Sequence, residues 1–450
     1  MSLQVVIIGA GAAGLTAALT LLEKGVNVQV FEAKERVGGR ILTGKIDDEL
    51  VEFGGQNICD GGDAQTMRRL IKQFGLKVKR TSIGRRGAFF DGKQLHDEAE
   101  LMANFRRDLN SLKQQLEKLG SSCTNMREIF DSLMKKESLQ YKNMEMRLRA
   151  YEGGTLDTLY SSYATTLYHM IAGGVVQGHE AVRNGSDSIA IDTIEGGNSR
   201  LLESMARELG DRVQLETPLK KVTKKAGGKL VLAFGGGTTV TADKVILTNP
   251  CPTYEKIAFD ESIIPSKRLD QIKQVPYSKR GKIILTMPEK KSTSSFLFGI
   301  DNAGVCFRVA GSKVVTLYLP IQFTPLTVSD VYEKEKPMLE AIYGTLESSQ
   351  SMPLYGLDIP FASYWGPIGY SWANDRFAGG SYSYFVAGQE ETFGKIIPCG
   401  KHQVKALFAP ISKTVYFAGE HTGIDPTIAG TMEAAFESGE RIARIVLEEC

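Results

Sequence analysis

The first thirty residues combine a short apolar run, a glycine-rich stretch and an apolar face at helical spacing. Residues 5–8 are apolar and β-branched, which predicts a buried strand of a parallel sheet. Leucines then recur every three or four residues as far as Leu22, and this spacing predicts a helix that ends near Gly25. A second β-branched run ends at Glu32. The pattern therefore predicts a strand–helix–strand unit with parallel strands.

The remaining chain alternates between helical and extended patterns. Residues 99–150 lack proline and carry apolar residues at helical spacing, which predicts a helical insert. Residues 230–241 hold two short runs around three consecutive glycines, a pattern typical of a hairpin. Residues 245–248 and 415–418 are apolar enough to be buried strands, and an amphipathic helix follows Gly430.

Charge and composition exclude several classes of protein. With 54 Lys and Arg against 52 Asp and Glu, a net charge of +2 gives no general attraction to nucleic acid or to an anionic membrane. The six cysteines are scattered and form no C-x-x-C pair, so we expect no disulfide framework, no metal site and a reduced, cytoplasmic location. Residues 5–22 carry no charge, but no Lys or Arg precedes them and glycines interrupt them. We therefore expect neither a signal peptide nor a membrane anchor.

The glycines of the first turn have the spacing of a dinucleotide-binding site. They form the pattern G-x-G-x-x-G between the predicted strand and the predicted helix. The first glycine permits a tight turn, the second lets the backbone approach a pyrophosphate, and the third lets helix and strand pack closely. The acid that ends the second strand can accept hydrogen bonds from a ribose. On this basis we assign to the cofactor Gly9, Gly11, Ala13, Gly14, Glu32 and Ala33.

Two further glycine pairs follow, which a nicotinamide-binding domain does not require. Residues 36–40 read Arg-Val-Gly-Gly-Arg, and residues 54–56 read Gly-Gly-Gln. An arginine beside such a turn can hold a pyrophosphate through two parallel hydrogen bonds. With these segments the sequence resembles the FAD-dependent amine oxidase superfamily, and monoamine oxidases in particular. The resemblance implies that the cofactor is FAD and not a nicotinamide dinucleotide. It adds to the cofactor site Arg36, Gly39, Arg40, Gly54, Gly55, Gln56 and Val222.

An aromatic segment carries the next part of the resemblance. Residues 361–385 hold nine aromatic residues, which predicts either a packed aromatic core or an aromatic pocket for an apolar or cationic substrate. Trp372 and the later run Gly-Gly-Ser-Tyr are similar to a superfamily element, which implies that Tyr382 forms one wall of the amine pocket. In monoamine oxidases a cysteine before that tyrosine is joined covalently to FAD. Here the residue is Ser381, so we expect FAD to be bound without a covalent bond.

The C-terminal segment repeats the arrangement of strand, acid, turn and helix. Gly419 and Glu420 follow the predicted strand, and Thr431 and Met432 open the last helix. The resemblance implies that the acid binds the ribityl hydroxyls and that a backbone N–H near Met432 faces the N1/O2 edge of the flavin. Reduced flavin is negatively charged at that edge, and the positive end of a helix dipole stabilises such a charge.

Three places in the sequence bear on the chemistry. Thr431 stands where monoamine oxidases have a second tyrosine, so their two-tyrosine cage is incomplete here. Residues 56–59 contain no arginine, which amino-acid oxidases often carry there to bind the substrate carboxylate, and this argues against an amino-acid substrate. Lys282 precedes three apolar residues and so lies on a strand, either at its wet end or, as the resemblance implies, holding a water against flavin N5.

Together the patterns and the resemblance imply an α/β fold of two domains. A Rossmann-like FAD-binding domain is expected from residues 1–85, 190–265 and 395–450, and an α+β substrate-binding domain with the helical insert from residues 86–189 and 266–394.

The resemblance implies an enzyme that oxidises the C–N bond of a small-molecule amine to the imine. FAD accepts the hydride, molecular oxygen reoxidises the flavin to give hydrogen peroxide, and Lys282 and Tyr382 are the candidate catalytic residues. Two alternatives stay open, because C–C desaturases and protoporphyrinogen oxidases share the terminal motifs and because a flavin-binding scaffold needs no turnover. A homodimer is also left open.

Overall fold

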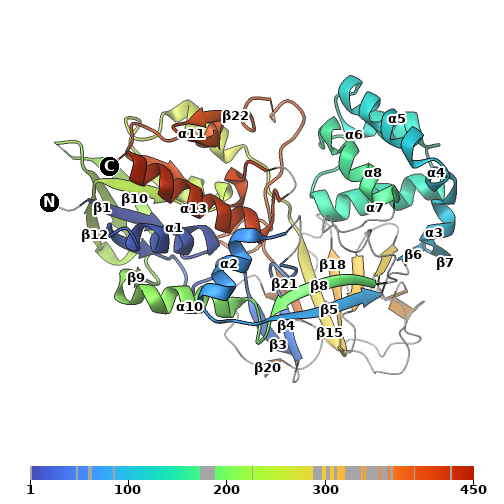
Figure 1. Cartoon of the computed structure of the whole chain (residues 1–450), viewed down its shortest axis with the longest axis horizontal. Coiled ribbons are helices and arrows are strands. Elements are labelled where there is room, and N and C mark those ends of the chain that lie inside the picture. The colour runs from blue at the N-terminus through green and yellow to red at the C-terminus, as the bar shows by residue number, and fades with distance from the viewer. Residues whose placement is uncertain are drawn as a thin grey trace.

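The computed structural model describes residues 3–46, 49–58, 63–84, 87–172, 188–225, 227–286, 296–299, 305–308, 312–319, 336–337, 339–340, 354–355, 363–364, 368–389, 391–425 and 428–449. Two regions of mixed strands and helices lie side by side along the long axis of the molecule, with the described residues of both chain ends in one of them (Figure 1).

A five-stranded sheet organises the region that holds the chain ends. Its order is β24-β13-β1-β2-β9, and all neighbouring strands are parallel. Three distant parts of the chain supply these strands, which confirms the strands expected from the apolar runs. Their bounds are Gln4–Ile8 for β1, Asn27–Phe31 for β2, Val213–Gln214 for β9, Lys244–Leu247 for β13 and Val415–Phe417 for β24.

The two faces of this sheet are covered by different layers. Because side chains alternate along a strand, Val5 and Ile7 of β1 pack with helices, whereas Val6 and Ile8 pack with a second sheet. The helices are α1 (Ala12–Leu22), α2 (Gln65–Gln73), α10 (Ser199–Leu209) and α13 (Met432–Glu448). The second sheet has the order β12-β11-β10-β14, with β10 at Leu219–Lys224, β11 at Leu230–Phe234, β12 at Thr239–Ala242 and β14 at Ala258–Phe259. It contains the predicted hairpin.

The other region is built on an eight-stranded sheet of order β19-β21-β15-β18-β17-β16-β6-β7. The central strand β15 (Gly281–Thr286) carries Lys282 and pairs with β18 (Val314–Leu319) and β21 (Ile368–Ser371). The remaining strands are β6 (Gly87–Phe90), β7 (Leu95–Asp97), β16 (Phe296–Gly299), β17 (Val305–Arg308) and β19 (Leu354–Tyr355).

Short strands connect the two regions. β3 (Thr43–Ile46) and β4 (Glu49–Glu52) form a hairpin, and β20 (Ser363–Tyr364) extends it. β5 (Val78–Gly84) pairs with β8 (Ser188–Ile194), and these two strands run beneath the helical insert (Figure 1). A last hairpin joins β22 (Ile396–Cys399) to β23 (His402–Lys405).

The segment expected as a helical insert is helical, but it is divided into several helices. These are α3 (Glu98–Leu101), α4 (Ala103–Arg106), α5 (Leu109–Ser122), α6 (Met126–Leu133) and α7 (Leu139–Glu152), followed by α8 (Ala164–Ala172). The divisions lie at capping residues, since the side chains of Asp108, Asn125 and Ser138 each accept a backbone N–H at the start of the next helix. The helices share a core of their own that includes Phe130, Met144 and Leu167.

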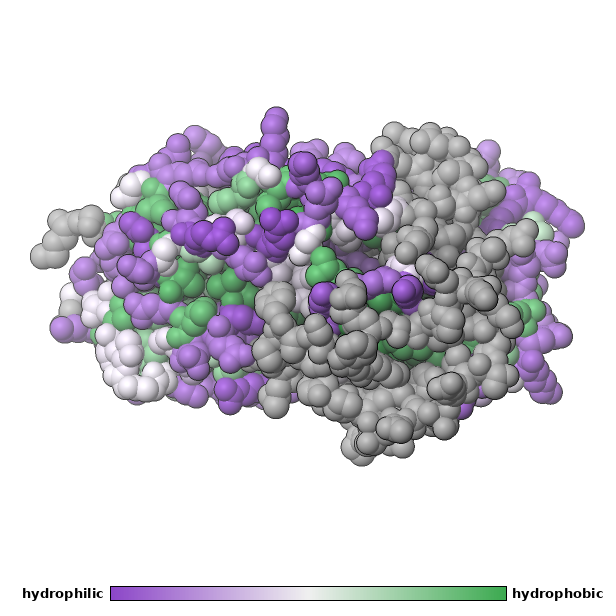
Figure 2. All heavy atoms as spheres, turned by 90° about the horizontal axis from the view of Figure 1, so that it is seen from below, coloured by the Kyte–Doolittle hydropathy of each residue, from purple (hydrophilic) through white to green (hydrophobic). Residues whose placement is uncertain are grey.

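The fold class expected from the sequence is confirmed, whereas the domain boundaries stay a prediction. Residues 5–22, which lack charge, form β1, the glycine turn and α1. No helix in the described part of the chain is long and apolar enough to span a bilayer. On the face seen in Figure 2, polar side chains are interspersed with smaller apolar areas among the described residues.

Candidate active site

One cavity of about 1090 Å³ joins the nucleotide-binding turn to the aromatic segment. This volume is slightly above the range of about 300–1,000 Å³ that is usual for ligand sites, so a large ligand fits. The cavity brings together most of the residues assigned from the sequence. Those that line it are Gly9, Gly11, Ala13, Glu32, Ala33, Gly39, Arg40, Gly54, Gly55, Gln56, Lys282, Trp372, Tyr382, Gly419, Glu420, Thr431 and Met432.

The first glycine turn has the close backbone approach that its sequence predicts. Gly9 has a φ of +104°, which favours glycine. A Cβ on Gly14 would lie 1.9 Å from the carbonyl oxygen of Gly9, so a larger residue would push α1 away from β1. Gly11 faces Gly39, and a Cβ on Gly39 would lie 3.4 Å from the Gly11 Cα. Bare backbone at the start of α1 therefore forms this part of the cavity wall.

Glu32 lies directly after β2 and points toward this turn. Its carboxylate accepts hydrogen bonds from the backbone N–H groups of Ala10, at 2.7 Å, and Lys34, at 3.0 Å. Burial raises the pKa of Glu32 above its usual value, and the two N–H donors oppose that rise. A carboxylate has about four acceptor positions, so further acceptor capacity remains for hydroxyl groups.

The second glycine pair is held by Arg36. Its guanidinium donates to the carbonyl oxygens of Val37 and Gly39, both at 3.1 Å, and the side chain does not line the cavity. Gly38 and Gly39 have φ values of +104° and +57°, so this turn also depends on glycine. Arg36 therefore stabilises the turn from behind.

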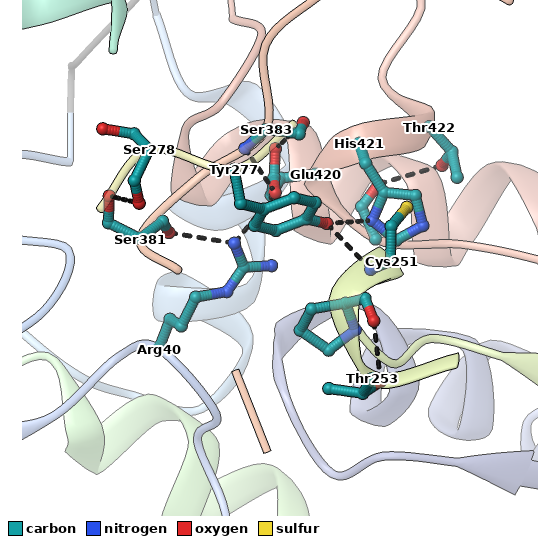
Figure 3. Close-up of polar contacts among 12 residues, drawn as sticks. Arg40, Cys251, Thr253, Tyr277, Ser278, Ser381, Ser383, Glu420, His421 and Thr422 are labelled. Atoms are coloured by element: carbon teal, nitrogen blue, oxygen red, sulfur yellow. Dashed lines mark hydrogen bonds and ion pairs between the residues drawn. The ribbon is translucent and has the colours of Figure 1, made fainter. Parts of the chain in front are cut away.

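Arg40 and Glu420 connect the two ends of the chain. The Arg40 Nη1 atom donates to Glu420 Oε1 at 2.8 Å and to the Ser381 carbonyl oxygen at 2.9 Å, and the guanidinium lies over the ring of Tyr277 (Figure 3). Ser383 donates to the same carboxylate through its N–H and its hydroxyl. Burial alone would raise the pKa of Glu420, but the electrostatic interactions with Arg40 and His421 and the hydrogen bonds from Ser383 and Arg40 together outweigh it, so the pKa is lowered.

A buried hydrogen-bonded chain lies behind this ion pair. The Tyr277 hydroxyl oxygen is 3.1 Å from Nδ1 of His421 and accepts the N–H of Cys251 at 3.3 Å (Figure 3). Burial lowers the pKa of His421 to about 3, so the imidazole is neutral at neutral pH. These residues fix the segment that carries Glu420.

Lys282 is buried and held by backbone carbonyls. Its ammonium group donates to the carbonyl oxygens of Glu52, at 2.7 Å, and Gly54, at 2.9 Å, and to Gln56 Oε1 at 3.3 Å. Lys282 therefore does not lie at a solvent-exposed end of its strand, because only 7% of its surface is exposed. The Glu52 carboxyl accepts bonds from Thr43 and from the N–H of Asn198. Burial raises the pKa of Glu52 to about 7, although the charge of Lys282 acts in the opposite direction.

The aromatic segment contributes to both a core and a wall. Tyr370 and Trp372 pack edge to face with ring centroids 4.6 Å apart, and the Trp372 Nε1 donates to the Phe53 carbonyl. Tyr382 lines the cavity, and its hydroxyl donates to the carbonyl oxygen of Tyr151 at 2.6 Å. Tyr370 is therefore part of a packed core and Tyr382 is part of the cavity wall, whereas Phe361 and Trp365 lie outside the described residues.

The last helix begins at the cavity. The Thr431 hydroxyl caps α13 by accepting the N–H of Ala434 at 3.3 Å. Gly55 packs against Met432, because a Cβ there would lie 2.6 Å from Met432 Cγ. The positive end of the α13 dipole and the Gly54–Gly55 segment therefore meet at the same place.

Three residues that were assigned to the cofactor from the sequence do not line the cavity, and several residues that do line it were not predicted from the sequence. Arg36 and Gly14 support turns, and Val222 is buried in the core between the two sheets, with Thr217 and Leu219 lining the cavity in its place. The residues that sequence reasoning missed include Tyr151, Glu152, Arg280 and Tyr318. His169 also lines the cavity. None of these lies in a motif.

The comparisons with known proteins place this geometry in a family. The family described as flavin containing amine oxidoreductase matches residues 12–447. The chain belongs to this family. A flavin-containing amine oxidase of Oncorhynchus mykiss is 24% identical over 99% of this chain and 86% of its own length. The structure of cyclohexylamine oxidase from Brevibacterium oxydans is 18% identical, with a TM-score of 0.75 and coverage of 100% of this chain and 99% of that one. Wild-type putrescine oxidase bound to putrescine gives a TM-score of 0.73 at 18% identity, with full coverage of both chains.

The cavity of this flavin-containing amine oxidoreductase fits FAD. A dinucleotide needs close backbone approach, a helix N-terminus and an acid at a strand end, and the Gly11–Gly39 contact, α1 and Glu32 provide these. A flavin needs positive potential at the edge that becomes anionic, and the start of α13 provides it. The family therefore identifies the chain as an oxidoreductase that uses FAD and acts on amines.

Proposed function

We propose that this enzyme oxidises the C–N bond of a small-molecule amine to an imine and that molecular oxygen is the final electron acceptor. The observation that supports this most is the single cavity that runs from the dinucleotide turn to the aromatic wall at Tyr382. When bound, FAD supplies the hydride-accepting chemistry, and oxygen takes the electrons as hydrogen peroxide. The imine then hydrolyses in water.

We propose that the cofactor is held by three groups of residues. The first turn and Glu32 bind the adenosine half, as the N–H groups at the start of α1 and the carboxylate at the end of β2 suggest. Arg40 and Glu420 form a charge pair beside the middle of the cofactor. The start of α13, with Thr431 and Met432, stabilises negative charge at the reactive end.

Lys282 and Tyr382 are proposed to act on the substrate side. Lys282 places a positive charge beside Gly54 and Gln56, where a low dielectric strengthens its attraction for developing negative charge. Tyr382 forms an aromatic wall whose hydroxyl is fixed by the Tyr151 carbonyl. Its ring excludes water and orients the amine rather than exchanging a proton, since burial raises the pKa of its phenol.

The proposal is tested by hydrogen peroxide release over a panel of aryl, cyclic, monoalkyl and diamine substrates. The named structures of cyclohexylamine oxidase and putrescine oxidase suggest cyclohexylamine and putrescine as first members. Lys282→Met, with the same FAD content, serves as the low-activity control. Peroxide that depends on both amine and Lys282 supports the proposal, and no peroxide with any amine contradicts it. Desaturation of a porphyrinogen or polyene by the same preparation would favour the alternative chemistry. The cytoplasmic location and a homodimer stay predictions.

A further inference from the structure

Arg280 is a fully buried arginine beside the candidate active site. It stands directly before β15, two residues from Lys282, and none of its surface is exposed. Arg280 is among the residues that line the same cavity as Lys282 and Tyr382. The guanidinium lies over the ring of Tyr318, 5.1 Å from its centroid, and 5.9 Å from the centroid of the Tyr382 ring.

The three guanidinium nitrogens of Arg280 have no hydrogen-bond partner in the part of the chain that the structure describes. Glu152 lines the same cavity, yet its carboxylate makes no hydrogen bond with these nitrogens. Two other basic residues of this region differ, since the buried Lys282 has three oxygen partners and the partly buried Arg40 has a carboxylate. An arginine cannot lose its charge in a protein, and a buried charge without an anion is costly. The two aromatic faces offset only part of that cost.

We propose that Arg280 binds a carboxylate of the substrate, so that the amine is an amino acid or another amine that carries a carboxylate. This inference rests on the proposed amine oxidation. A planar guanidinium matches a carboxylate through two parallel hydrogen bonds, which an aromatic cavity wall cannot provide. Residues 56–59 contain no arginine, but they contribute to only one wall of the cavity. Arg280 comes from another wall.

The stacking on two tyrosines fixes where the anion would lie. Tyr318 pairs with Lys282 across the β15–β18 ladder, and Tyr382 is the proposed aromatic wall. A guanidinium that contacts both rings cannot rotate freely, so its fork is preorganised, and less entropy is lost when a carboxylate binds. An amine without a carboxylate would leave the guanidinium buried and unsatisfied, so it would bind more weakly.

Matched substrate pairs test this inference on the holoenzyme. Phenylalanine and 2-phenylethylamine differ by one carboxylate, as do ornithine and putrescine, and 4-aminobutyrate and propylamine form a pair with the acid further from the amine. Anaerobic flavin reduction is measured for each compound. We expect the carboxylate-bearing member of at least one pair to react with a kcat/KM at least tenfold higher. If the decarboxylated member is equal or better in every pair, the inference is wrong while amine oxidation stands.

Variants separate a carboxylate-binding role from a structural one. Arg280→Met should lower kcat/KM for the preferred carboxylate substrate by at least tenfold and reduce the ratio of kcat/KM between the two members of the pair. Arg280→Lys should keep part of the preference for the carboxylate substrate. Lys279→Met removes an exposed positive charge from the neighbouring position and should leave kcat/KM and the ratio unchanged. An equal loss on both members of the pair in Arg280→Met would contradict the inference.

If no compound reduces the flavin, the proposed amine oxidation is contradicted. A binding measurement then still tests whether Arg280 binds a carboxylate. Benzoate and benzyl alcohol are titrated into the oxidised holoenzyme, and the change in flavin absorbance gives each Kd. We expect benzoate to bind at least tenfold more tightly than benzyl alcohol, and Arg280→Met to abolish that difference. An unchanged Kd for benzoate in Arg280→Met would overturn the inference whatever the outcome with substrates.

Discussion

At the scale of single residues, the site depends on contacts between residues that lie far apart in the sequence. Lys282 donates to the Glu52 carbonyl, 230 positions away, and Arg40 pairs with Glu420, 380 positions away. Local spacing predicted the glycine turn and Glu32, because those residues are neighbours along the chain. It could not predict Arg280, Glu152 or the Tyr277–His421 contact, since each depends on segments that only the fold brings together.

The role of Lys282 gives the first prediction. Lys282→Met keeps most of the side-chain length, removes the charge and leaves the carbonyls of Glu52 and Gly54 without this donor. We expect the variant to bind FAD but to turn over at least tenfold more slowly, which corresponds to about 1.4 kcal/mol of lost stabilisation or more. Stopped-flow measurements should follow reduction and reoxidation separately. Lys279→Met is the control, and wild-type rates in both half-reactions would remove Lys282 from the site.

The acid next to Lys282 gives a prediction for pH dependence. The pKa of Glu52 is about 7 in the folded chain against an ordinary value of 4.5, and burial is the main cause. As pH rises from 4.5 to 7, the unfolded chain loses this proton first, so the folded state loses stability across that window, by about 3 kcal/mol at roughly 1.4 kcal/mol per pKa unit.

Glu52→Gln should therefore not lose folding stability between pH 4.5 and pH 7 in the way that wild type does. The free energy of unfolding of the variant relative to wild type should rise between pH 4.5 and pH 8, as measured by urea denaturation at several pH values. Glu208→Gln, at an exposed position of α10, is the matched control. A difference between Glu52→Gln and wild type that is independent of pH would show that Glu52 is ionised throughout.

At the scale of elements, the contact between the first and last helices positions the cofactor site. A Cβ on Gly439 of α13 would lie 2.2 Å from the Ala13 carbonyl oxygen of α1, so the two helices approach at backbone distance. Both helices begin at the cavity. The sequence predicted each helix from its apolar spacing, but nothing in the pattern indicated that they touch. Similarly, the sequence predicted helix for residues 99–150 but not where one helix ends and the next begins. The apolar spacing continues across those points, whereas N-capping side chains start new helices there.

The close contact predicts the effect of adding one methyl group. Gly439→Ala should destabilise the folded chain by about 1–3 kcal/mol, the usual cost of overpacking, and should weaken FAD binding because α1 and α13 move apart. Urea denaturation and the Kd for FAD measure the two effects. Arg444→Ala, at an exposed position of α13, should change stability by about 0.5 kcal/mol or less. Equal stability and equal Kd for FAD in the two variants would contradict the proposed role of the contact between α1 and α13.

At the scale of the whole molecule, the fold class was predictable and the strand order was not. The glycine turn and the terminal motifs indicated an α/β flavoprotein, and the family confirms this. The position of β13 between β24 and β1 joins segments that are more than 150 residues apart, so no local pattern specifies it. Likewise, one cavity that contains residues from both ends of the chain arises only when the sheet is assembled.

The state of the cofactor is a prediction for the whole protein. The resemblance implies that Ser381 stands at the position of the linking cysteine, and its hydroxyl donates to the Ser278 carbonyl at 2.8 Å. A serine forms no thioether, so the purified protein should be yellow and acid precipitation should release all FAD into the supernatant. Flavin absorbance is measured in the supernatant and the pellet. Flavin that stays with the precipitated protein would show a covalent bond.

The most direct test of the central claim is anaerobic reduction of the bound flavin by a substrate that carries an amine. The purified holoenzyme is mixed without oxygen with each member of the amine and amino-acid panel, and the visible absorbance of oxidised flavin is followed. We expect that at least one compound bleaches the flavin, that the rate falls at least tenfold in Lys282→Met, and that the colour returns when oxygen is admitted. A flavin that stays oxidised with every amine, but is bleached by a compound with an oxidisable C–C bond and no amine, would contradict amine oxidation by this protein.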